Sequence, residues 1–457
     1  MIMRFAFVLV LLLSATPAFA AKDKVLDIQV IKSTSGIEAW LVEDHSVPVV
    51  SVNFSFEGGL AYDPEDKPGV GRLVSIMMDE GAGDLKSQEF QSKLSDNAIS
   101  MGFTAGRDAF YGKLRTLSAN RQMAFDLLRL ALSKPRFDAD ALERMKNANV
   151  ADINRNMGDP NWLVARTFNG LLYEGHYYAR PGFGTLDSMQ SITRKDLLDF
   201  VRGQFARDVL KISISGDISK QDALAAIDNV FGGLPANADK VEMTDAPFNY
   251  GGKTVLLPLE VPQTFIAAGQ PGIKRSDKDW HAAMVMNYIL GGSSFDARLM
   301  REIRKKRGLT YGVYSALYSM KRASILQADM SASNDKAEEA LSLLREAWAE
   351  MAKDGPTREE LETAKSYLTG SLVLELTSTG DIADVLNGMQ RDGLDPDYIN
   401  KRAGIINALS MEDIKRVSKK LLDPEKLAVI LVGKPKNIAV DVLLDKPPGM
   451  TESTPKP

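Results

Sequence analysis

The chain has 457 residues, which is too long for one ordinary hydrophobic core and predicts at least two domains. With 44% hydrophobic and 25% charged residues, its composition is that of a globular protein rather than a disordered one. The formal net charge of −4 provides no basic surface for nucleic acid or for an anionic membrane, and we expect neither as a partner of the mature chain.

The first twenty residues have the pattern of an export signal. Arg4 precedes the apolar run Phe5–Leu13, and Ala18 and Ala20 supply the small residues that a signal peptidase reads. A membrane anchor is the alternative, but this run is too short to cross about 30 Å of hydrocarbon. The absence of cysteine excludes a lipoprotein linkage and disulfides. We therefore expect cleavage after Ala20 and location in the periplasm.

Alternating strands and amphipathic helices follow along the chain. Apolar and polar residues alternate, or apolar residues run on to a glycine, over Val49–Phe56, Leu210–Gly216, Gln263–Gly269 and Leu427–Gly433. Apolar residues three and four apart predict long helices, among them Asn120–Leu132 and Ala337–Ala352. The order shows no regular strand–helix–strand alternation. It predicts an α+β fold with mainly antiparallel sheets.

The two halves of the chain repeat one pattern. In each, a Ser/Thr cap opens a short helix that leads to a strand ending in glycine. The offset between Gly216 and Gly433 is 433 − 216 = 217, and the same offset carries Asp196 onto Asp413. We therefore expect two copies of one fold.

The expected domain boundaries follow from this repeat. After the signal at 1–20 we expect an N-terminal domain at 21–232 and a linker at 233–252, where a Gly-Gly-Leu-Pro turn and polar residues interrupt the periodicity. A C-terminal domain at 253–445 would then precede a disordered tail at 446–457, rich in Pro, Lys, Ser and Thr.

One stretch of the second half resembles a known family. The segment Gly291–Leu299, with the sequence GGSSFDARL, is followed by Arg304 and then by Gly308–Ser315, with the sequence GLTYGVYS. This pattern resembles the insulinase, pitrilysin and mitochondrial processing peptidase family of zinc metallopeptidases, and the resemblance extends over nearly the whole mature chain. It implies two homologous domains, each a mainly antiparallel sheet flanked by helices, that together form half of a clamshell.

The resemblance also indicates where zinc would bind, and there the ligands are missing. The family motif H-x-x-E-H lies on a helix after the first strand, and here the frame from Pro64 to Gly81 is intact. The ligand positions fall on Arg72, Ser75 and Ile76. Arginine has no lone pair to donate, isoleucine is inert, and serine is a poor zinc ligand.

The family's third ligand falls on Asp152, which would be the only survivor of the set. Two alternatives remain open for it: an ion pair with Arg72 that replaces the missing metal charge, or two unrelated solvated side chains. The three histidines, His45, His176 and His281, lie far apart and have no ligand partner at helical spacing. We therefore expect no metal or other cofactor in this chain, and Zn²⁺ only in a partner subunit.

In the second half, the resemblance implies roles for Arg304 and Tyr311. The family's tyrosine hydrogen-bonds the scissile carbonyl as negative charge develops, and its arginine anchors the peptide, so both would be catalytic and substrate-binding residues. The alternative is an ordinary helix end capped by Gly308, with Tyr311 at the start of a strand. Arg307 is the neighbour most easily mistaken for Arg304.

Peptide substrates would also be held by strand addition at an exposed sheet edge. The candidate edges are the segment near Ser100–Thr104 and its counterpart in the second domain.

Some bacterial members of the family consist of two half-length chains, of which one carries H-x-x-E-H and the other only the Arg/Tyr pair. This chain resembles the second type, which implies an exported H-x-x-E-H subunit as partner and a heterodimer that degrades peptides. A non-proteolytic scaffold or peptide-binding protein of the same fold is the alternative. A self-sufficient zinc protease would need ligands that this sequence lacks.

Overall fold

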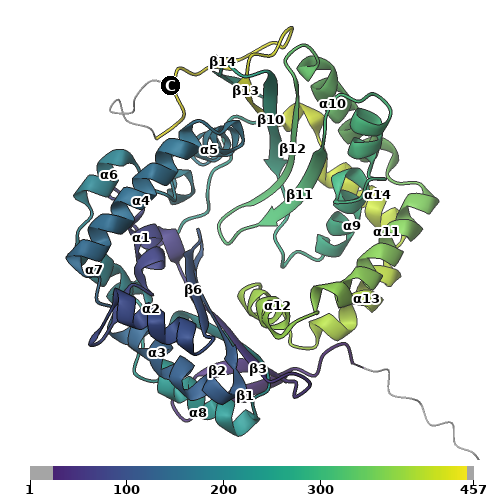
Figure 1. The fold of residues 1–457 in the computed structure, drawn as a ribbon. Coiled ribbons are helices and arrows are strands. Elements are labelled where there is room, and N and C mark those ends of the chain that lie inside the picture. Colours follow the sequence, from purple (N-terminus) through teal and green to yellow (C-terminus); the bar gives the residue numbers. More distant parts are fainter. Residues whose placement is uncertain (1–23, 450–457) are drawn as a thin grey trace, which may run out of the picture.

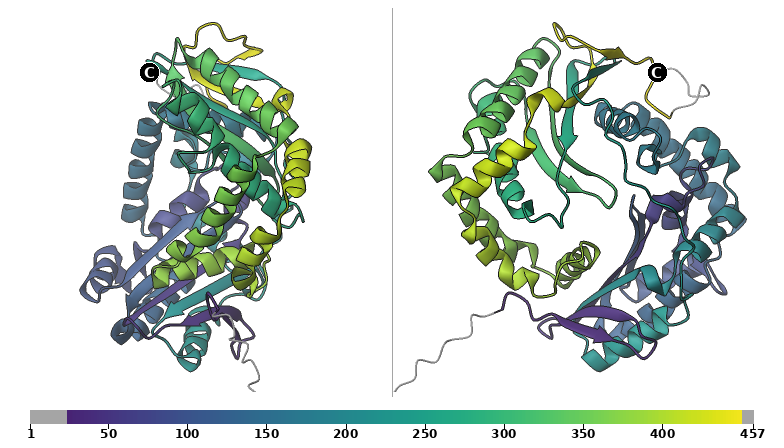
Figure 2. Two further views of the ribbon diagram at one scale, coloured as in Figure 1. Left: turned by 90° about the vertical axis from the view of Figure 1, so that its right-hand side faces the viewer. Right: turned by 180° about the vertical axis from the view of Figure 1, so that it is seen from behind.

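A computed structural model describes residues 24–449 of the protein, so the expected export signal and residues 450–457 lie outside the described part. Two six-stranded sheets face the centre of a ring, and most helices lie around its outside (Figure 1). The views from the side and from behind show the same ring, with the helices of the two halves along its outer wall (Figure 2). No helix within residues 24–449 is both long and apolar enough to cross a bilayer.

The first sheet is built from strands of the first half. Its order is β1 (Gln29–Lys32), β2 (Glu38–Glu43), β8 (Leu210–Gly216), β3 (Val49–Glu57), β7 (Ala109–Leu117) and β6 (Ser100–Ala105). All neighbours pair antiparallel except β2 and β8, which are parallel. A short hairpin, β4 (Gly81–Ala82) and β5 (Leu85–Lys86), lies apart from it.

The second sheet repeats this order. It runs β14 (Val442–Leu443), β9 (Thr254–Pro258), β13 (Ala428–Gly433), β10 (Gln263–Pro271), β12 (Ser324–Ser333) and β11 (Val313–Ser319). Here β13, β9 and β14 pair parallel, and the other neighbours are antiparallel. Five strands therefore correspond one to one between the sheets, and the predicted duplication and α+β fold are confirmed. The expectation of mainly antiparallel sheets holds, with parallel pairs at one side of each sheet.

Both halves contribute α-helices to the ring. The first half contains α1 (Val70–Met77), α2 (Ser87–Asp96), α3 (Arg121–Ser133), α4 (Ala139–Met157), α5 (Pro160–Leu172), α6 (Leu186–Ser191), α7 (Arg194–Gln204) and α8 (Lys220–Phe231). The second half contains α9 (Trp280–Gly291), α10 (Ala337–Asp354), α11 (Arg358–Gly370), α12 (Thr379–Arg391), α13 (Tyr398–Ala408) and α14 (Met411–Leu421). Residues 232–253 between the halves form no helix or strand.

The repeated caps have the geometry that the sequence predicts. Thr193 and Asp196 form a capping box at the start of α7, and Ser410 and Asp413 form the matching box at α14. Each box satisfies two of the amide groups that the first helical turn leaves without a partner. This local chemistry explains why both helix starts could be read from the sequence.

Each half covers the sheet of the other with one helix, and the first of these contacts is apolar. Helix α5 of the first half packs on β13 and β10 of the second sheet. Phe168 of α5 is 1% exposed and lies so close to Gly269 of β10 that a side chain there would overlap its ring. Val432 and Ile430 of β13 belong to the same buried cluster. The strand β13 is therefore apolar on both faces.

The reciprocal contact, made by α12 on the first sheet, is polar over β3 and β8 and apolar over β2, where Trp40 and Val42 share a buried cluster with α12. Asn53 Nδ2 of β3 donates to Asp384 Oδ1 at 2.8 Å, and the hydroxyls of Ser51 and Thr379 lie 2.9 Å apart. Ser213 Oγ of β8 donates to the carbonyl of Ala383 at 2.7 Å. The alternation of β3 therefore separates an apolar core face from a polar face that is buried under a helix from the other half.

A buried ion pair fixes the segment between α9 and β11. Arg298 Nε and Nη2 donate to the two carboxylate oxygens of Glu360 at 2.9 and 2.7 Å, and Nη2 also donates to the carbonyl of Gly355 at 2.8 Å. Burial would raise the pKa of Glu360, but the hydrogen bonds from Arg298 and from the Thr357 amide lower it to about 2. The ion pair joins this segment to the start of α11.

Replacing Phe168 by alanine should destabilise the whole chain. The cavity left between α5 and the second sheet should lower the free energy of unfolding by about 3–5 kcal/mol. Urea unfolding followed by circular dichroism measures this change. Val373→Ala is the matched control, because Val373 is 64% exposed and its loss should change stability by less than about 0.5 kcal/mol. Equal midpoints for the two variants would contradict the role of α5.

The Arg298–Glu360 pair should make stability fall in acid. An unfolded glutamate titrates near pH 4.3, so a folded pKa of about 2 stabilises the fold above about pH 4.3, and this contribution is lost as the pH falls through 2. The contribution of the lowered pKa to the free energy of unfolding should be about 3 kcal/mol. The free energy of unfolding of the wild type should exceed that of Glu360→Gln by less at pH 3 than at pH 6. Urea unfolding at the two pH values measures this difference. Glu359→Gln, an exposed neighbour, should show no such difference from the wild type at either pH.

Candidate functional site

The helix that carries the lost zinc positions begins at a buried carboxylate. Asp63 is 5% exposed, and its two oxygens accept hydrogen bonds of 2.7 Å from the amides of Gly69 and Gly71 at the start of α1. Burial raises the pKa of Asp63 to about 7, although these two hydrogen bonds and the charge of Arg180 oppose the rise. Gly69 has a φ of +100°, which favours glycine at this turn. The start of α1, the helix at the motif position, is therefore held by hydrogen bonds from two backbone amides to Asp63.

Arg72 occupies the first ligand position and contacts Asp152 of α4. Its Nη2 lies 3.8 Å from Asp152 Oδ2, and its guanidinium lies over the ring of Phe183 at 4.9 Å. Burial lowers the pKa of Arg72 and Asp152 opposes this change. Of the two alternatives that the sequence left open, the structure has the ion pair, although it is too long for a hydrogen bond.

The remaining positions of the set are engaged within the chain. Asp152 also pairs with Arg155 on its own helix, so its carboxylate lies between two guanidinium groups. Ser75 is buried and its hydroxyl donates to the carbonyl of Arg72 at 2.8 Å. Ile76 packs against the core of the first domain. No cluster of three or more His, Cys, Asp or Glu residues suited to a metal occurs within residues 24–449.

The three histidines have structural surroundings. His45, for which the sequence offered no partner, lies with Nδ1 2.7 Å from Asp217 Oδ1, and this hydrogen bond raises its pKa. His176 Nε2 lies 3.0 Å from the carbonyl of Thr244. His281 Nε2 lies 3.0 Å from the hydroxyl of Tyr398, and burial lowers the pKa of His281 to about 4.

In the second domain, Arg304 lies in a π-helical turn, η5 (Met300–Lys305). Such turns are rare and often occur at functional sites. Gly308, three residues after the end of this turn, has a φ of +64°, and the Leu309 amide donates to the carbonyl of Ile303 at 3.0 Å. The glycine-capped end that the sequence offered as an alternative is therefore present, and Arg304 lies within it.

Arg304 differs from its basic neighbours because it has no acidic partner. Arg298 and Arg301 pair with Glu360, Lys305 pairs with Asp296, and Lys306 and Arg307 pair with Glu302. Within the described part of the chain, Arg304 pairs with no carboxylate; its guanidinium lies over the ring of Phe295 at 4.9 Å and 4.0 Å from the sulfur of Met300. Arg307, the neighbour most easily mistaken for it, is thus neutralised while Arg304 is not.

Tyr311 lies in the loop before β11, not at the start of the strand, which begins at Val313. Its side chain is 82% exposed, and its hydroxyl has no hydrogen-bond partner among residues 24–449. The loop leaves a phenol and an unpaired guanidinium available to groups outside this part of the molecule.

The structure brings Arg72 and Asp152 into contact, but neither of them contacts Arg304 or Tyr311. No hydrogen bond, ion pair or ring contact between described residues links Arg304 or Tyr311 to the lost zinc positions. Sequence reasoning missed the two rings that support the arginines, Phe183 and Phe295. Phe295 lies inside the GGSSFDARL segment, so its position offered a signal, whereas nothing local to Phe183 pointed to α1.

The two expected edges for strand addition are edge strands. Ser100–Thr104 lies in β6, at one end of the first sheet, and β11 occupies the equivalent end of the second sheet. Alternate residues of β6 are exposed, beginning with Ser100. β11 is partly covered, because Asn287 Nδ2 of α9 donates to the carbonyl of Ser315 at 3.1 Å.

Family models match most of the chain. The model described as insulinase (peptidase family M16) matches residues 39–181, and the model described as peptidase M16 inactive domain matches residues 191–368. Among curated relatives, a non-peptidase homologue, YmxG, of Helicobacter pylori is 26% identical over 72% of this chain and 76% of its own length. An uncharacterized zinc protease YmxG of Bacillus subtilis is 23% identical over 84% of this chain and 92% of its own.

Solved structures agree with this assignment. A peptidase M16 inactive domain from Pseudomonas fluorescens is 29% identical and superposes with a TM-score of 0.83 over 91% of this chain and all of its own. A chain of complex III from Candida albicans, 14% identical, has the same fold with a TM-score of 0.76 over 90% of this chain and 97% of its own. The chain thus belongs to the insulinase (M16) family, as a homologue that lacks the zinc-binding residues of the family's peptidases.

Proposed function

We propose that the chain is the non-catalytic, substrate-binding and transition-state-stabilising subunit of a heterodimeric periplasmic zinc metallopeptidase that degrades peptides. One observation carries the proposal. Of the six basic residues between 298 and 307, Arg304 alone has no carboxylate partner within residues 24–449, and the phenol of Tyr311 close by in sequence is exposed and unbonded. A cation and a hydroxyl kept free in this way are suited to an oxygen on which negative charge develops.

The chemistry explains why both groups would matter. Attack of water on a peptide carbonyl places negative charge on its oxygen, and donors fixed near that oxygen stabilise the transition state. A phenol and a guanidinium each contribute about 3 kcal/mol in a site from which water is excluded. Phe295 holds the guanidinium in place through its ring face.

The water must be activated by another polypeptide, because the lost zinc positions of this chain cannot bind a metal. Arg72, Ser75 and Ile76 provide no ligand, and Asp152 already pairs with Arg72 and Arg155. The expected partner is an exported half-length subunit that carries H-x-x-E-H and Zn²⁺. The export signal at 1–20 would bring both subunits to the periplasm.

A non-proteolytic scaffold or peptide-binding protein is the second candidate. The Helicobacter pylori relative, named a non-peptidase homologue, favours it. A neighbouring reading frame with an export signal and H-x-x-E-H would favour the peptidase, and its absence would favour the scaffold.

Peptide cleavage should require both chains. The purified mature chain alone should contain no stoichiometric zinc and should cleave no peptide, whereas its mixture with the H-x-x-E-H subunit should be active and lose activity to a chelator. Metal analysis and cleavage of a quenched fluorescent peptide measure this. The mixture with a partner whose motif glutamate is changed to glutamine is the control for contaminating proteases. Chelator-sensitive cleavage by this chain alone would contradict the proposal.

Removal of the Tyr311 hydroxyl should slow the assembled enzyme. Tyr311→Phe should lower kcat by about 10²-fold or more, because one transition-state donor is lost, with little change in assembly. Tyr367→Phe is the control, since Tyr367 is 49% exposed and lies on α11 rather than on β11. Steady-state kinetics and analytical gel filtration give the two readouts. The same rate for both variants would exclude the role of Tyr311.

A further inference from the structure

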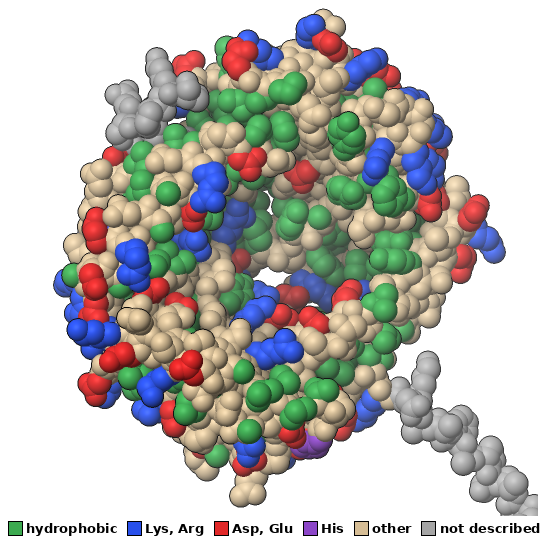
Figure 3. Space-filling view, viewed as in Figure 1, with side chains coloured by type: hydrophobic (Ala, Val, Ile, Leu, Met, Phe, Trp, Pro, Cys, Tyr) green, Lys and Arg blue, Asp and Glu red, His purple; other side chains and the backbone are tan. Residues whose placement is uncertain are grey.

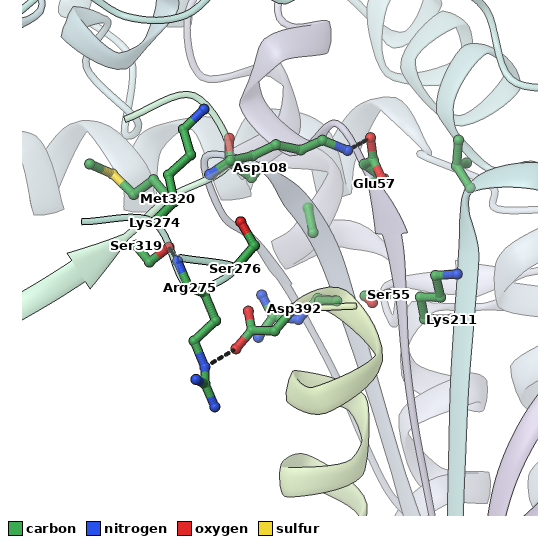
Figure 4. Close-up of a pocket in the computed structure, with 14 residues that line it drawn as sticks. Ser55, Glu57, Asp108, Lys211, Lys274, Arg275, Ser276, Ser319, Met320 and Asp392 are labelled. Atoms are coloured by element: carbon green, nitrogen blue, oxygen red, sulfur yellow. Dashed lines mark hydrogen bonds and ion pairs between the residues drawn. The ribbon is translucent and has the colours of Figure 1, made fainter. Parts of the chain in front are cut away.

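A cavity of about 250 Å³ lies where the two halves of the ring meet (Figure 4), and neither Arg304 nor Tyr311 lines it. Strands β3 and β8 of the first sheet form one wall. The other walls are the segment after β10, the turn between β11 and β12, and the end of α12. The space-filling view shows the hollow at the centre of the ring, with basic and acidic side chains around it (Figure 3).

The walls of this junction cavity carry more basic than acidic groups. Five cationic side chains line it, Lys211, Lys274, Arg275, Lys321 and Arg391, against three carboxylates, Glu57, Asp108 and Asp392. The difference is 5 − 3 = +2. A cavity lined by more cations than carboxylates favours an anionic ligand.

All three carboxylates are already engaged. Glu57 pairs with Lys321, and Asp392 Oδ2 lies 3.5 Å from Arg275 Nε, as the dashed lines of Figure 4 mark. Asp108 accepts hydrogen bonds of 3.0 and 2.7 Å from the phenols of Tyr177 and Tyr178, and one of 3.0 Å from the Lys321 amide. The acids of the cavity therefore have little capacity left for the other cations.

Two cations of the cavity and its most deeply buried hydroxyl have no acidic partner in the described chain. Ser55 Oγ is buried, with the residue 1% exposed, and has no hydrogen-bond partner at all. Lys211 lies directly opposite Ser55 in the β3–β8 register, so both side chains project from the same face of the sheet. Arg391 donates only to the hydroxyl of Tyr111, at 2.7 Å. A buried hydroxyl that lines the same cavity as two unpaired cations adds up to a donor set that a carboxylate satisfies.

The position of β11 relates this cavity to Tyr311. Ser319, the last residue of β11, lines the cavity, and Tyr311 lies just before the first residue, Val313. Seven residues of strand span about 20 Å. Tyr314 and Tyr318, both 46% exposed, lie on the same face of β11 between the two points. An extended peptide of about six residues would reach from the cavity to Tyr311.

We propose that the junction cavity binds the C-terminal carboxylate of a peptide substrate, through Lys211, Ser55 and Arg391. The proposal rests on the proposed function and adds a substrate class to it: peptides with a free C-terminus. Binding of the C-terminus in the cavity would determine how many residues separate it from the peptide bond that lies beside Tyr311. Acidic side chains offer the same chemistry, so the test must separate the two sources of a carboxylate.

The test measures binding of N-terminally fluorescent decapeptides to the full mature chain by anisotropy, without any partner. Two peptides of one sequence are compared, a free acid and a C-terminal amide, together with a third, an amide whose last residue is replaced by glutamate. The free acid should bind about tenfold more tightly than either amide. Lys211→Met should remove most of that preference and leave the affinity for the amides unchanged. Lys93→Met, at an exposed lysine of α2, should behave as wild type.

The outcomes separate this proposal from the proposed function. Equal affinity for all three peptides, or a preference for the free acid that survives Lys211→Met, would overturn the carboxylate site while peptide binding stands. Equal affinity for the free acid and the glutamate-terminated amide would show that any acidic group suffices and would also overturn it. Failure to bind any of the peptides would overturn the peptide-binding role itself.

Discussion

Each sheet of this protein has one face that its own half leaves uncovered, and the need to bury that face determines the arrangement of the whole molecule. Helix α5 of the first half covers the second sheet, and α12 of the second half covers the first. This exchange closes the chain into a ring and brings the end of α12 beside β3 and β8. The junction cavity exists only because segments from both halves meet there.

The two covering contacts use different chemistry, although the helices hold equivalent places in the repeat. Phe168 and its neighbours on α5 bury apolar surface against β13, and this contact gains stability from the area removed from water. Over β3 and β8, the α12 contact consists of hydrogen bonds such as those of Asn53 with Asp384 and Ser213 with Ala383, and only its margin on β2 is apolar. Each such bond adds little net stability, but it forms only at a defined distance and angle. These bonds therefore fix the position of α12 more than they stabilise the contact.

The local elements of the fold could be predicted from the sequence because their causes are local. The alternation of β3 and the capping boxes of α7 and α14 act over a few residues. The burial of Ser51, Asn53 and Ser55 could not be predicted, since alternation alone suggests a solvated polar face. A helix more than three hundred residues away covers Ser51.

The candidate residues could be named from the sequence, but the ion pairing around them could not. The GGSSFDARL and GLTYGVYS segments pointed to Arg304 and Tyr311. Which cation of the basic run stays unpaired depends on Glu302, Asp296 and Glu360, and on the fold that presents them. The same holds for the junction cavity, whose donors Ser55, Lys211 and Arg391 come from three distant segments.

The capping of α1 by Asp63 bears on how such a homologue can arise. The turn before this helix is held by a carboxylate and two backbone amides, and none of these groups would touch a zinc ion bound further along the helix. Substitution of the ligands would therefore abolish metal binding and leave the hydrogen bonds that cap α1 in place. A chain of this family can therefore lose its metal ligands and keep its architecture.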